Sequence, residues 1–171
     1  MPVVGLIGTD LLTRRDDMVV AVDPFDGKTK SVVAKAMTPD IAVFHAVAAD
    51  RHGNVSCGYD SEAVILAEAS GHVVVTAERI VDHIGEKDAQ GTFIPGIHVD
   101  SVVHAPFGAH PGGCTGFYGQ DKIHMRDYVI ASKDDESFAE YIRAHVFEVQ
   151  NHADYIERFV DRKSTRLNSS H

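Results

Sequence analysis

The stretch IAVFHAVAADRHGNVSCGYDSEAVILAEASGHVVVTA, residues 41–77, decides the fold class of this chain. It begins with the nearly continuous apolar run Ile41–Ala49, which is typical of a strand covered on both faces of a sheet. Ser61–Ala69 contains good helix formers, and His72–Ala77 is rich in the β-branched residues that favour strands. A strand, a helix and a second strand joined by short turns form a βαβ unit, so the sequence predicts an α/β fold with a parallel sheet.

Shorter strands are expected before this unit, and helices are expected after it. Apolar runs predict three strands, at Val3–Ile7, Met18–Val22 and Ser31–Met37. Amphipathic patterns predict three helices, at Asp121–Ala131, Glu136–Val149 and Asn151–Phe159. The expected architecture is therefore one α/β layer followed by a helical cap.

Composition limits the class of protein to which the chain can belong. A length of 171 residues, with 44% hydrophobic and 24% charged residues, is typical of one soluble globular domain. A net charge of −9 argues against a nucleic-acid partner, and no apolar run approaches the roughly 20 residues of a membrane span. The N-terminus lacks the basic region and cleavage site of a signal peptide, and the two cysteines form no disulfide framework. The sequence therefore predicts a cytoplasmic protein with no nucleic-acid or membrane partner.

The last eleven residues, DRKSTRLNSSH at positions 161–171, form a segment of a different kind. They are polar, show no apolar period, and correspond codon by codon to a common sequencing-adapter sequence. We therefore expect residues 161–171 to be a non-native tail and residues 1–160 to form the domain. Resequencing the source DNA tests this expectation, because native codons after Val160 would contradict it.

A glycine-rich loop follows the next expected strand, Val99–His104. Its sequence, PFGAHPGGCTGFYG at positions 106–119, contains five glycines, and glycine serves where backbone turns sharply or approaches another group. In a structural interpretation these glycines only form turns, while the aromatic residues cover the edge of the core. In a functional interpretation the backbone amides face a thioester or carboxylate oxygen, and His110 donates a hydrogen bond to it. The sequence leaves both interpretations open.

The spacing of histidines, cysteines and acids in the sequence indicates no metal site and no catalytic group. His98, His104 and His110 recur at every sixth position, but zinc sites have tighter spacing with a Cys or carboxylate partner, so we predict no metal site. His45 lies within an apolar run and is expected to be a hydrogen-bonded core histidine. Cys114 has no nucleophile signature around it, and the spacing of the acids singles out no general acid–base pair. No nucleotide-binding glycine motif is present either.

Five segments occur in an order and spacing that resemble a known enzyme family. They are GTDLL (Gly8–Leu12), DPFDG (Asp23–Gly27), PDIAVFHAVAADRHGN (Pro39–Asn54), VVVTAERIVD (Val73–Asp82) and IPGIHVDSVVHAPFGAHP (Ile94–Pro111). Together they resemble the A (alpha) subunit of the family I CoA-transferases. Within that family they most resemble the glutaconate CoA-transferases. The resemblance covers nearly all of residues 4–160. It implies a three-layer α/β fold, like that of the CoA-transferases, with a parallel-rich sheet and C-terminal helices.

The resemblance also implies a mechanism and a partner. In this family a glutamate attacks the acyl-CoA thioester, forms an acyl-glutamyl anhydride, and then carries CoA to an acceptor carboxylate. In the two-subunit members that glutamate belongs to the B (beta) subunit, which implies a hetero-oligomer and no catalytic residue on this chain. Coenzyme A is then a substrate, and no cofactor is implied. By analogy, Gly108, Ala109, His110 and Pro111 are the expected substrate-binding residues.

The chain also departs from the family pattern. In the family, a comparable half with its own strand and glycine loop precedes GTDLL, and it is missing here. Residues 1–160 are therefore expected to be a C-terminal half fragment that is inactive and poorly folded alone, with an exposed sheet edge. Two alternatives remain open at this point: a CoA-transferase-like acyl-CoA hydrolase of the ring-opening type, and a non-catalytic histidine-rich metal-binding module.

Overall fold

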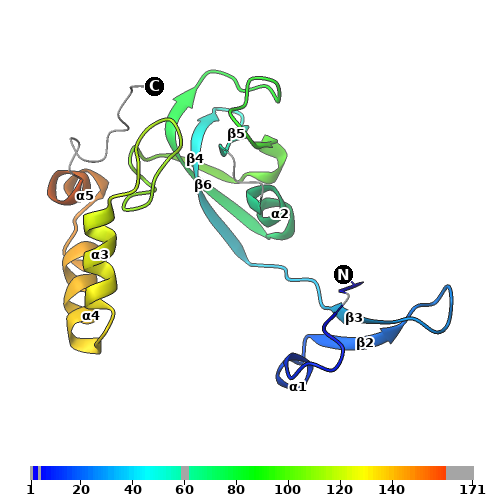
Figure 1. The fold of residues 1–171 in the computed structure, drawn as a ribbon. Helices are drawn as coiled ribbons and strands as arrows, with labels where there is room; N and C mark the ends of the chain where they lie inside the picture. The colour runs from blue at the N-terminus through cyan, green and yellow to red at the C-terminus, as the bar shows by residue number, and fades with distance from the viewer. Residues whose placement is uncertain (1, 4, 59–61, 161–171) are drawn as a thin grey trace, which may run out of the picture. The chain divides into compact units, whose positions relative to one another are not determined.

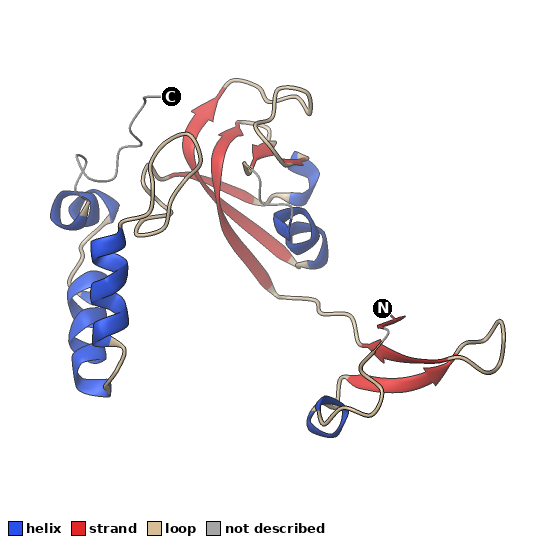
Figure 2. Ribbon diagram, viewed as in Figure 1, coloured by secondary structure: helices blue, strands red, loops and turns tan. Residues whose placement is uncertain are grey.

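The computed structural model describes residues 2–3, 5–58 and 62–160 of the chain. The chain forms two compact units, Met1–Pro39 and Asp40–His171. Each unit has its own sheet, as Figures 1 and 2 show.

The first unit is a three-stranded antiparallel sheet with the strand order β1-β3-β2. Its elements are β1 (Pro2–Val3), α1 (Leu11–Arg14), β2 (Met18–Val22) and β3 (Lys30–Ala34). The turn between β2 and β3 is held by Asp26, whose Oδ1 accepts hydrogen bonds from the N–H groups of Lys28 and Thr29 at 2.8 Å. Gly27 has a φ of +65°, a conformation that glycine adopts readily, and it completes the turn.

The second unit is built on a five-stranded sheet with the strand order β7-β5-β4-β6-β8. Its strands are β4 (Ile41–Asp50), β5 (Val55–Ser56), β6 (His72–Val81), β7 (Phe93–Ile94) and β8 (Ser101–His104). β4 pairs in parallel with β6 and β6 with β8, while β5 and β7 extend the other edge in antiparallel pairing. The helix α2 (Glu62–Ala69) precedes β6 in the chain. The predicted parallel βαβ arrangement and the α/β fold class are therefore confirmed.

Different segments cover the two faces of this sheet. On one face, the alanine and valine side chains of β4 and β6 form a core cluster with Ala63 and Ala67 of α2. On the other face, Val47 of β4 clusters with Cys114 and Tyr118, which belong to the glycine-rich loop. Ala46 and Val47 are neighbours on β4 and belong to different clusters, because successive side chains of a strand point to opposite faces. The glycine-rich loop therefore acts as a covering layer of the sheet, opposite α2.

Helices complete the second unit. They are α3 (Lys122–Ala131), α4 (Asp135–Ile142), a π-helical turn η2 (Arg143–Phe147) and α5 (His152–Phe159). α3 and α4 lie side by side (Figure 1). Asp121, Asp134 and Asn151 cap the N-termini of α3, α4 and α5, because each side chain accepts from backbone N–H groups of the first turn. Within the described residues, no helix has the length and apolar character required to cross a membrane.

Four strand predictions and one helix prediction are wrong in their bounds. The strand predicted at Ser31–Met37 ends at Ala34, and the strand predicted at Val99–His104 begins at Ser101. The strand predicted at Val3–Ile7 ends at Val3, and Gly5, with a φ of +103°, then turns the chain. The strand predicted to end at Ala77 continues to Val81 and therefore contains Glu78. The single helix predicted at residues 136–149 is α4 followed by the wider π-turn η2, in which Glu148 N–H bonds the carbonyl of Arg143 at 2.9 Å.

The expectation that β4 is covered on both faces holds only for its second half. Residues 46–50 are buried, but Ile41 is 60% exposed and Val43 is 64% exposed. The apolar pattern of the sequence is the same in both halves, so it did not distinguish a covered segment from an uncovered one. The predicted helix start at Ser61 and the tail at 161–171 lie outside the described residues.

Candidate functional site

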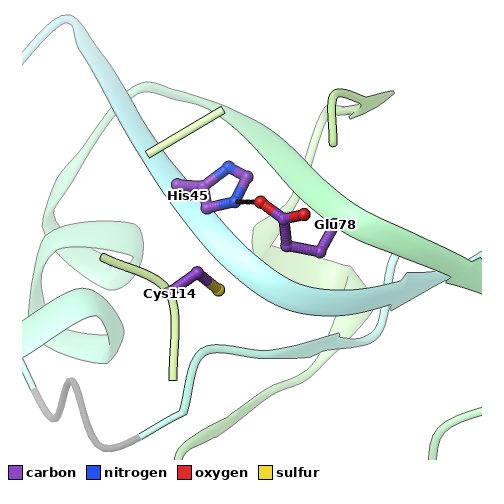
Figure 3. Close-up of side chains that lie close together, drawn as sticks. All are labelled: His45, Glu78 and Cys114. Carbon is purple, nitrogen blue, oxygen red and sulfur yellow. Dashed lines mark hydrogen bonds and ion pairs between the residues drawn. The ribbon is translucent and has the colours of Figure 1, made fainter. Parts of the chain in front are cut away.

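The carboxylate of Glu78 is the centre of the candidate site. Its side chain lies on β6, is 4% exposed, and contacts His45 of β4 (Figure 3). Oε1 accepts hydrogen bonds from Nε2 of His45 at 2.8 Å and from the hydroxyl of Tyr118 at 2.7 Å. Oε2 accepts from the N–H of Phe107 at 3.0 Å. One carboxylate thus connects two neighbouring strands with the loop that follows β8.

The register of the sheet brings the strand side chains of this site to one face. His45 lies opposite Thr76 in the parallel pairing of β4 with β6, and Glu78 follows two residues later on the same strand. Side chains two residues apart on a strand share a face, so all three groups meet below the loop. Nδ1 of His45 is 2.8 Å from Oγ1 of Thr76. Both ring nitrogens of His45 therefore have partners, as the sequence predicted for a core histidine.

The loop approaches these side chains most closely at Phe107 and Gly108. Phe107 has a φ of +62°, a left-handed conformation that few residues other than glycine adopt, and Glu78 holds its N–H in place. The ring of Phe107 stacks on Tyr118 with 4.8 Å between ring centroids. A Cβ atom on Gly108 would lie 2.8 Å from the ring of His45, so the close approach requires glycine at this position.

Burial and hydrogen bonds set the protonation states in this cluster. Burial alone would raise the pKa of Glu78, but hydrogen bonds from His45, Tyr118 and the Phe107 N–H outweigh it and hold that pKa below its ordinary value. Burial, followed by the bond to Glu78, raises the pKa of Tyr118 far above its ordinary value. Burial and the nearby charge of Glu78 raise the pKa of the Cys114 thiol to about 11. At neutral pH the cluster therefore contains a carboxylate, a neutral phenol and a neutral thiol.

A cavity of about 310 Å³ opens beside this cluster. Its lining residues are His45, Val47, Cys57, Ala109, Gly113, Cys114 and Thr115. The volume lies near the lower end of the roughly 300–1,000 Å³ of small-molecule sites. The lining contains an imidazole and two thiols but no carboxylate, so the cavity offers shape and weakly polar groups rather than charge.

A larger cavity of about 550 Å³ lies beside the ends of β4 and β6 and includes Asp50 and His104. The carboxylate of Asp50 already accepts hydrogen bonds from the backbone N–H groups of His52, Asn54 and Ile84. These bonds hold the turn after β4, whose Asp, Gly and Asn residues are typical of turns. We therefore assign Asp50 a structural role and place the candidate site at the smaller cavity.

Of the four predicted substrate-binding residues, Ala109 lines this cavity, whereas Gly108, His110 and Pro111 are not among its lining residues. The N–H of Ala109 donates to the hydroxyl of Tyr118 at 3.0 Å. The N–H groups of Gly108 and His110 donate to the carbonyl groups of Ala105 and Phe107 at 2.9 and 3.0 Å. A substrate oxygen binds these amides only if those bonds break. Substrate binding by these four residues therefore stays a prediction.

The side chain of His110 lies in a different environment from the cavity. It is fully buried, with Nδ1 at 2.9 Å from the hydroxyl of Tyr155 in α5 and Nε2 at 3.3 Å from Oδ2 of Asp121. Its ring also contacts the ring of His124 edge-on, at 5.0 Å between centroids. His110 therefore connects the loop to the C-terminal helices.

The evenly spaced histidines of the sequence do not converge on one point. His98 ends the short 3₁₀ helix η1 (Gly96–His98), and Nε2 of His104 lies 3.2 Å from the carbonyl oxygen of Glu78. In the part of the chain that the structure describes, two other groups of three side chains each place three possible metal-ligand atoms within 4.8 Å of one another. These are His45 with Glu78 and Cys114, and His110 with Asp121 and His124.

A sequence model of the coenzyme A transferase family matches residues 6–105, more than half of the chain. The chain belongs to the coenzyme A transferase family. The matched region contains His45 and Glu78 and ends where the glycine-rich loop begins. The two strands that hold the centre of the site thus lie within the region that the family model matches.

Relatives of this coenzyme A transferase chain include two curated proteins and one solved structure. It is 35% identical over 146 residues to the A (alpha) subunit of glutaconate CoA-transferase from Acidaminococcus fermentans, covering 84% of this chain and 46% of that protein. It is 27% identical over 158 residues to the cholesterol ring-cleaving hydrolase IpdA subunit of Rhodococcus jostii, covering 85% of this chain and 53% of that protein. The crystal structure of glutaconate coenzyme A-transferase from A. fermentans matches it with a TM-score of 0.86 at 27% identity, covering 98% of this chain and 59% of that one. The chain spans about half the length of the curated relatives it matches.

Sequence reasoning did not single out Glu78 or its partner Tyr118. The two residues are 40 positions apart, and no local pattern connects them. One signal was available in the coenzyme A transferase segment Val73–Val81, where an acid stands in a β-branched run. A carboxylate inside a buried strand requires hydrogen-bonding partners, so that acid predicts a polar network around it.

Proposed function

We propose that this chain is part of the alpha subunit of an acyl-CoA:carboxylate CoA-transferase. The observation that carries the proposal is the 35% identity to the alpha subunit of glutaconate CoA-transferase over 84% of this chain. The TM-score of 0.86 to the solved glutaconate enzyme supports it. The working enzyme then contains a beta subunit as well, and coenzyme A is a substrate rather than a resident cofactor.

In the proposed reaction the thioester carbonyl of an acyl-CoA is attacked by a glutamate of the beta subunit. The carbon–sulfur bond breaks, CoA leaves as a thiolate, and an acyl-glutamyl anhydride remains. The thiolate then attacks the glutamyl carbonyl, which releases the first carboxylate and leaves a glutamyl-CoA thioester. An acceptor carboxylate then attacks the glutamyl-CoA thioester, and CoA leaves again as a thiolate. The thiolate attacks the acyl carbonyl of the new anhydride, which releases the new acyl-CoA and regenerates the glutamate.

The described part of this chain supports a nucleophile on the partner. Glu78 is the one buried glutamate beside the cavity in the described residues, and three hydrogen bonds already occupy its carboxylate. A carboxylate stabilised in this way is a poor nucleophile, because attack would break those bonds. The loop that Glu78 holds instead forms a wall of the cavity. In the proposed enzyme this wall excludes water, which would hydrolyse the anhydride.

The proposed compartment is the cytoplasm. The chain contains two cysteines, which are too few for a disulfide framework. Thiols that stay reduced fit a reducing compartment, which supports the proposal.

The test of this proposal is transfer by the complete alpha subunit copurified with its beta subunit. The complex is incubated with acetyl-CoA and glutaconate, and the CoA esters are separated by chromatography. We expect glutaconyl-CoA to form with no net release of free CoA. Mass spectrometry of the complex after incubation with acyl-CoA alone is expected to find CoA attached to a peptide of the beta subunit. A CoA adduct on a peptide of this chain would contradict the assignment of the nucleophile to the partner.

A CoA-transferase-like hydrolase is the second candidate function. It is favoured by the 27% identity to the ring-cleaving hydrolase subunit of R. jostii over 85% of this chain. The two functions differ in what happens without an acceptor acid. A hydrolase releases free CoA thiol from its acyl-CoA substrate in water alone, whereas a transferase moves CoA to an acceptor acid and gives no net release of free CoA. Failure of both reactions would overturn the proposed function.

A further inference from the structure

A group of two histidines and one aspartate, one buried and two half-buried, lies apart from the candidate site and is independent of the proposed function. It consists of His110 in the glycine-rich loop, Asp121 at the N-cap of α3, and His124 in the first turn of α3. The side chains of His110 and Asp121 are 0% and 11% exposed. We propose that these three side chains bind a divalent transition-metal ion of the zinc type.

The spacing of the ligand atoms carries this inference. One ligand atom from each of the three side chains lies within 4.8 Å of the other two. Nε2 of His110 and Oδ2 of Asp121 are 3.3 Å apart, which is long for a charge-assisted hydrogen bond. Two ligand atoms that each lie about 2.0–2.1 Å from a tetrahedral ion are about 3.4 Å apart. The observed separation therefore matches two ligands of one ion better than a donor and its acceptor.

Outer partners already orient each of the three ligands. The hydroxyl of Tyr155 is 2.9 Å from Nδ1 of His110, and the hydroxyl of Tyr141 is 2.7 Å from Nε2 of His124. Oδ1 of Asp121 accepts from two backbone N–H groups of α3 and leaves Oδ2 for the site. When Nε2 of His110 coordinates an ion, the ring proton lies on Nδ1, which then donates a hydrogen bond to the hydroxyl of Tyr155. Such outer hydrogen bonds fix the tautomer and the ring orientation of metal-ligating histidines.

The chemistry of the set fits zinc-type ions. Two imidazoles and one carboxylate form a common three-ligand set for zinc and leave a fourth position open. With neutral histidines the set carries one negative charge, which offsets part of the charge of the ion. The ion would link the glycine-rich loop to α3, and through the hydroxyl of Tyr155 to α5. The role assigned to it is therefore to dock the helices onto the loop.

The other group of possible ligands does not fit an ion in the same way. Nε2 of His45 and Oε1 of Glu78 are 2.8 Å apart, closer than the roughly 3.4 Å of two tetrahedral ligands. Glu78 also accepts bonds from Tyr118 and Phe107, so it already has donors for both oxygens. The thiol of Cys114 stays protonated beside it, whereas metal binding requires a thiolate. The hydrogen bonds of this cluster account for its geometry.

Zinc binding by the untagged, metal-stripped full chain tests the proposal. Zinc is titrated in competition with a chromophoric chelator, bound zinc is counted by elemental analysis, and the melting temperature is measured with and without zinc. Asp121→Asn removes the charge but retains a good N-cap, so the variant is expected to fold. His124→Gln removes one imidazole, and His72→Gln is the matched control, because His72 is exposed and lies on β6.

The expected result is one zinc ion per chain and a higher melting temperature with zinc. Asp121→Asn and His124→Gln are expected to weaken binding by more than the roughly 10- to 100-fold that the loss of an outer partner costs. His72→Gln is expected to bind like the unchanged chain. Absence of stoichiometric zinc, or equal binding by the chain and its His124→Gln variant, would overturn the proposal. Neither result bears on CoA transfer, so the two proposals fail independently.

Discussion

The hydroxyl of Tyr118 donates a 2.7 Å hydrogen bond to Oε1 of Glu78, across 40 positions of sequence. The same hydroxyl accepts the N–H of Ala109, a residue that lines the smaller cavity. The position of the cavity wall therefore depends on a carboxylate within the sheet. These two hydrogen bonds connect strand β6, which lies in the region matched by the family model, to the loop that follows that region.

Loss of the charge on Glu78 is expected to destabilise the fold. Glu78→Gln retains the size of the side chain but cannot accept the same three hydrogen bonds. Its amide NH2 group would face groups that themselves donate hydrogen bonds to Glu78. We expect the free energy of unfolding to fall by about 1–3 kcal/mol, measured by urea denaturation. Glu68→Gln in α2 is the control, because Glu68 is exposed. Equal losses in the two variants would contradict the central role of Glu78.

The low pKa of Glu78 predicts an acid-sensitive contribution to stability. Because this pKa is lower in the folded chain than its unfolded value of 4.5, the contribution is fully present above pH 4.5. It is lost as the pH falls through the lower folded pKa. The difference in unfolding free energy between the unchanged chain and Glu78→Gln should therefore be constant from pH 7 to about 5 and shrink below about 4.5. A difference that grows on acidification would show that the sign is wrong.

The thiol of Cys114 is expected to react slowly with alkylating agents. Its pKa of about 11 leaves only a small fraction of thiolate at pH 8, and thiolate is the reactive form. We expect alkylation by iodoacetamide to be roughly 100-fold slower than for an unhindered thiol of ordinary pKa. Peptide mass spectrometry measures the rate at Cys114 separately from Cys57, and the urea-unfolded chain provides the reference rate. A rate near that of the unfolded chain would contradict the burial of this thiol.

A methyl group at position 108 is expected to disturb the site. In Gly108→Ala the new Cβ atom would lie 2.8 Å from the ring of His45 and from the carbonyl oxygen of Ala105. Neither atom moves easily, so we expect a loss of about 1–3 kcal/mol in unfolding free energy. The matched control is Gly85→Ala, whose Cβ would meet the exposed carboxylate end of Asp88. That side chain can rotate away, so the control should stay close to the unchanged chain.

Local sequence patterns predicted the elements of the fold well. Met18–Val22 is a strand with the predicted bounds, and the pairing of β4 with β6 is parallel as the βαβ pattern required. Asp121 is the N-cap of α3, because its side chain accepts hydrogen bonds from backbone N–H groups only two and three residues later. Such features depend on residues within a few positions of each other, and these are the features that a sequence displays.

Long-range contacts of the site were not predictable in the same way. Glu78 acquires its role only when Tyr118 and Phe107 fold back over the sheet, and loop closure of this kind leaves no periodic signal. The expectation that His110 lies in the cleft came from analogy with the family and stays a prediction. No local pattern predicts that its ring meets Asp121 and Tyr155, because these contacts form only when the helices after the loop return to pack against it.

The uncovered half of β4 has a consequence for how such a protein is produced in a cell. Ile41 and Val43 present aliphatic side chains to water on a strand whose other end is buried. A surface of this kind binds whatever apolar surface reaches it first, including further copies of the same chain. We therefore expect the yield of usable protein to follow the ratio in which the cell synthesises this chain and the partner we propose for it.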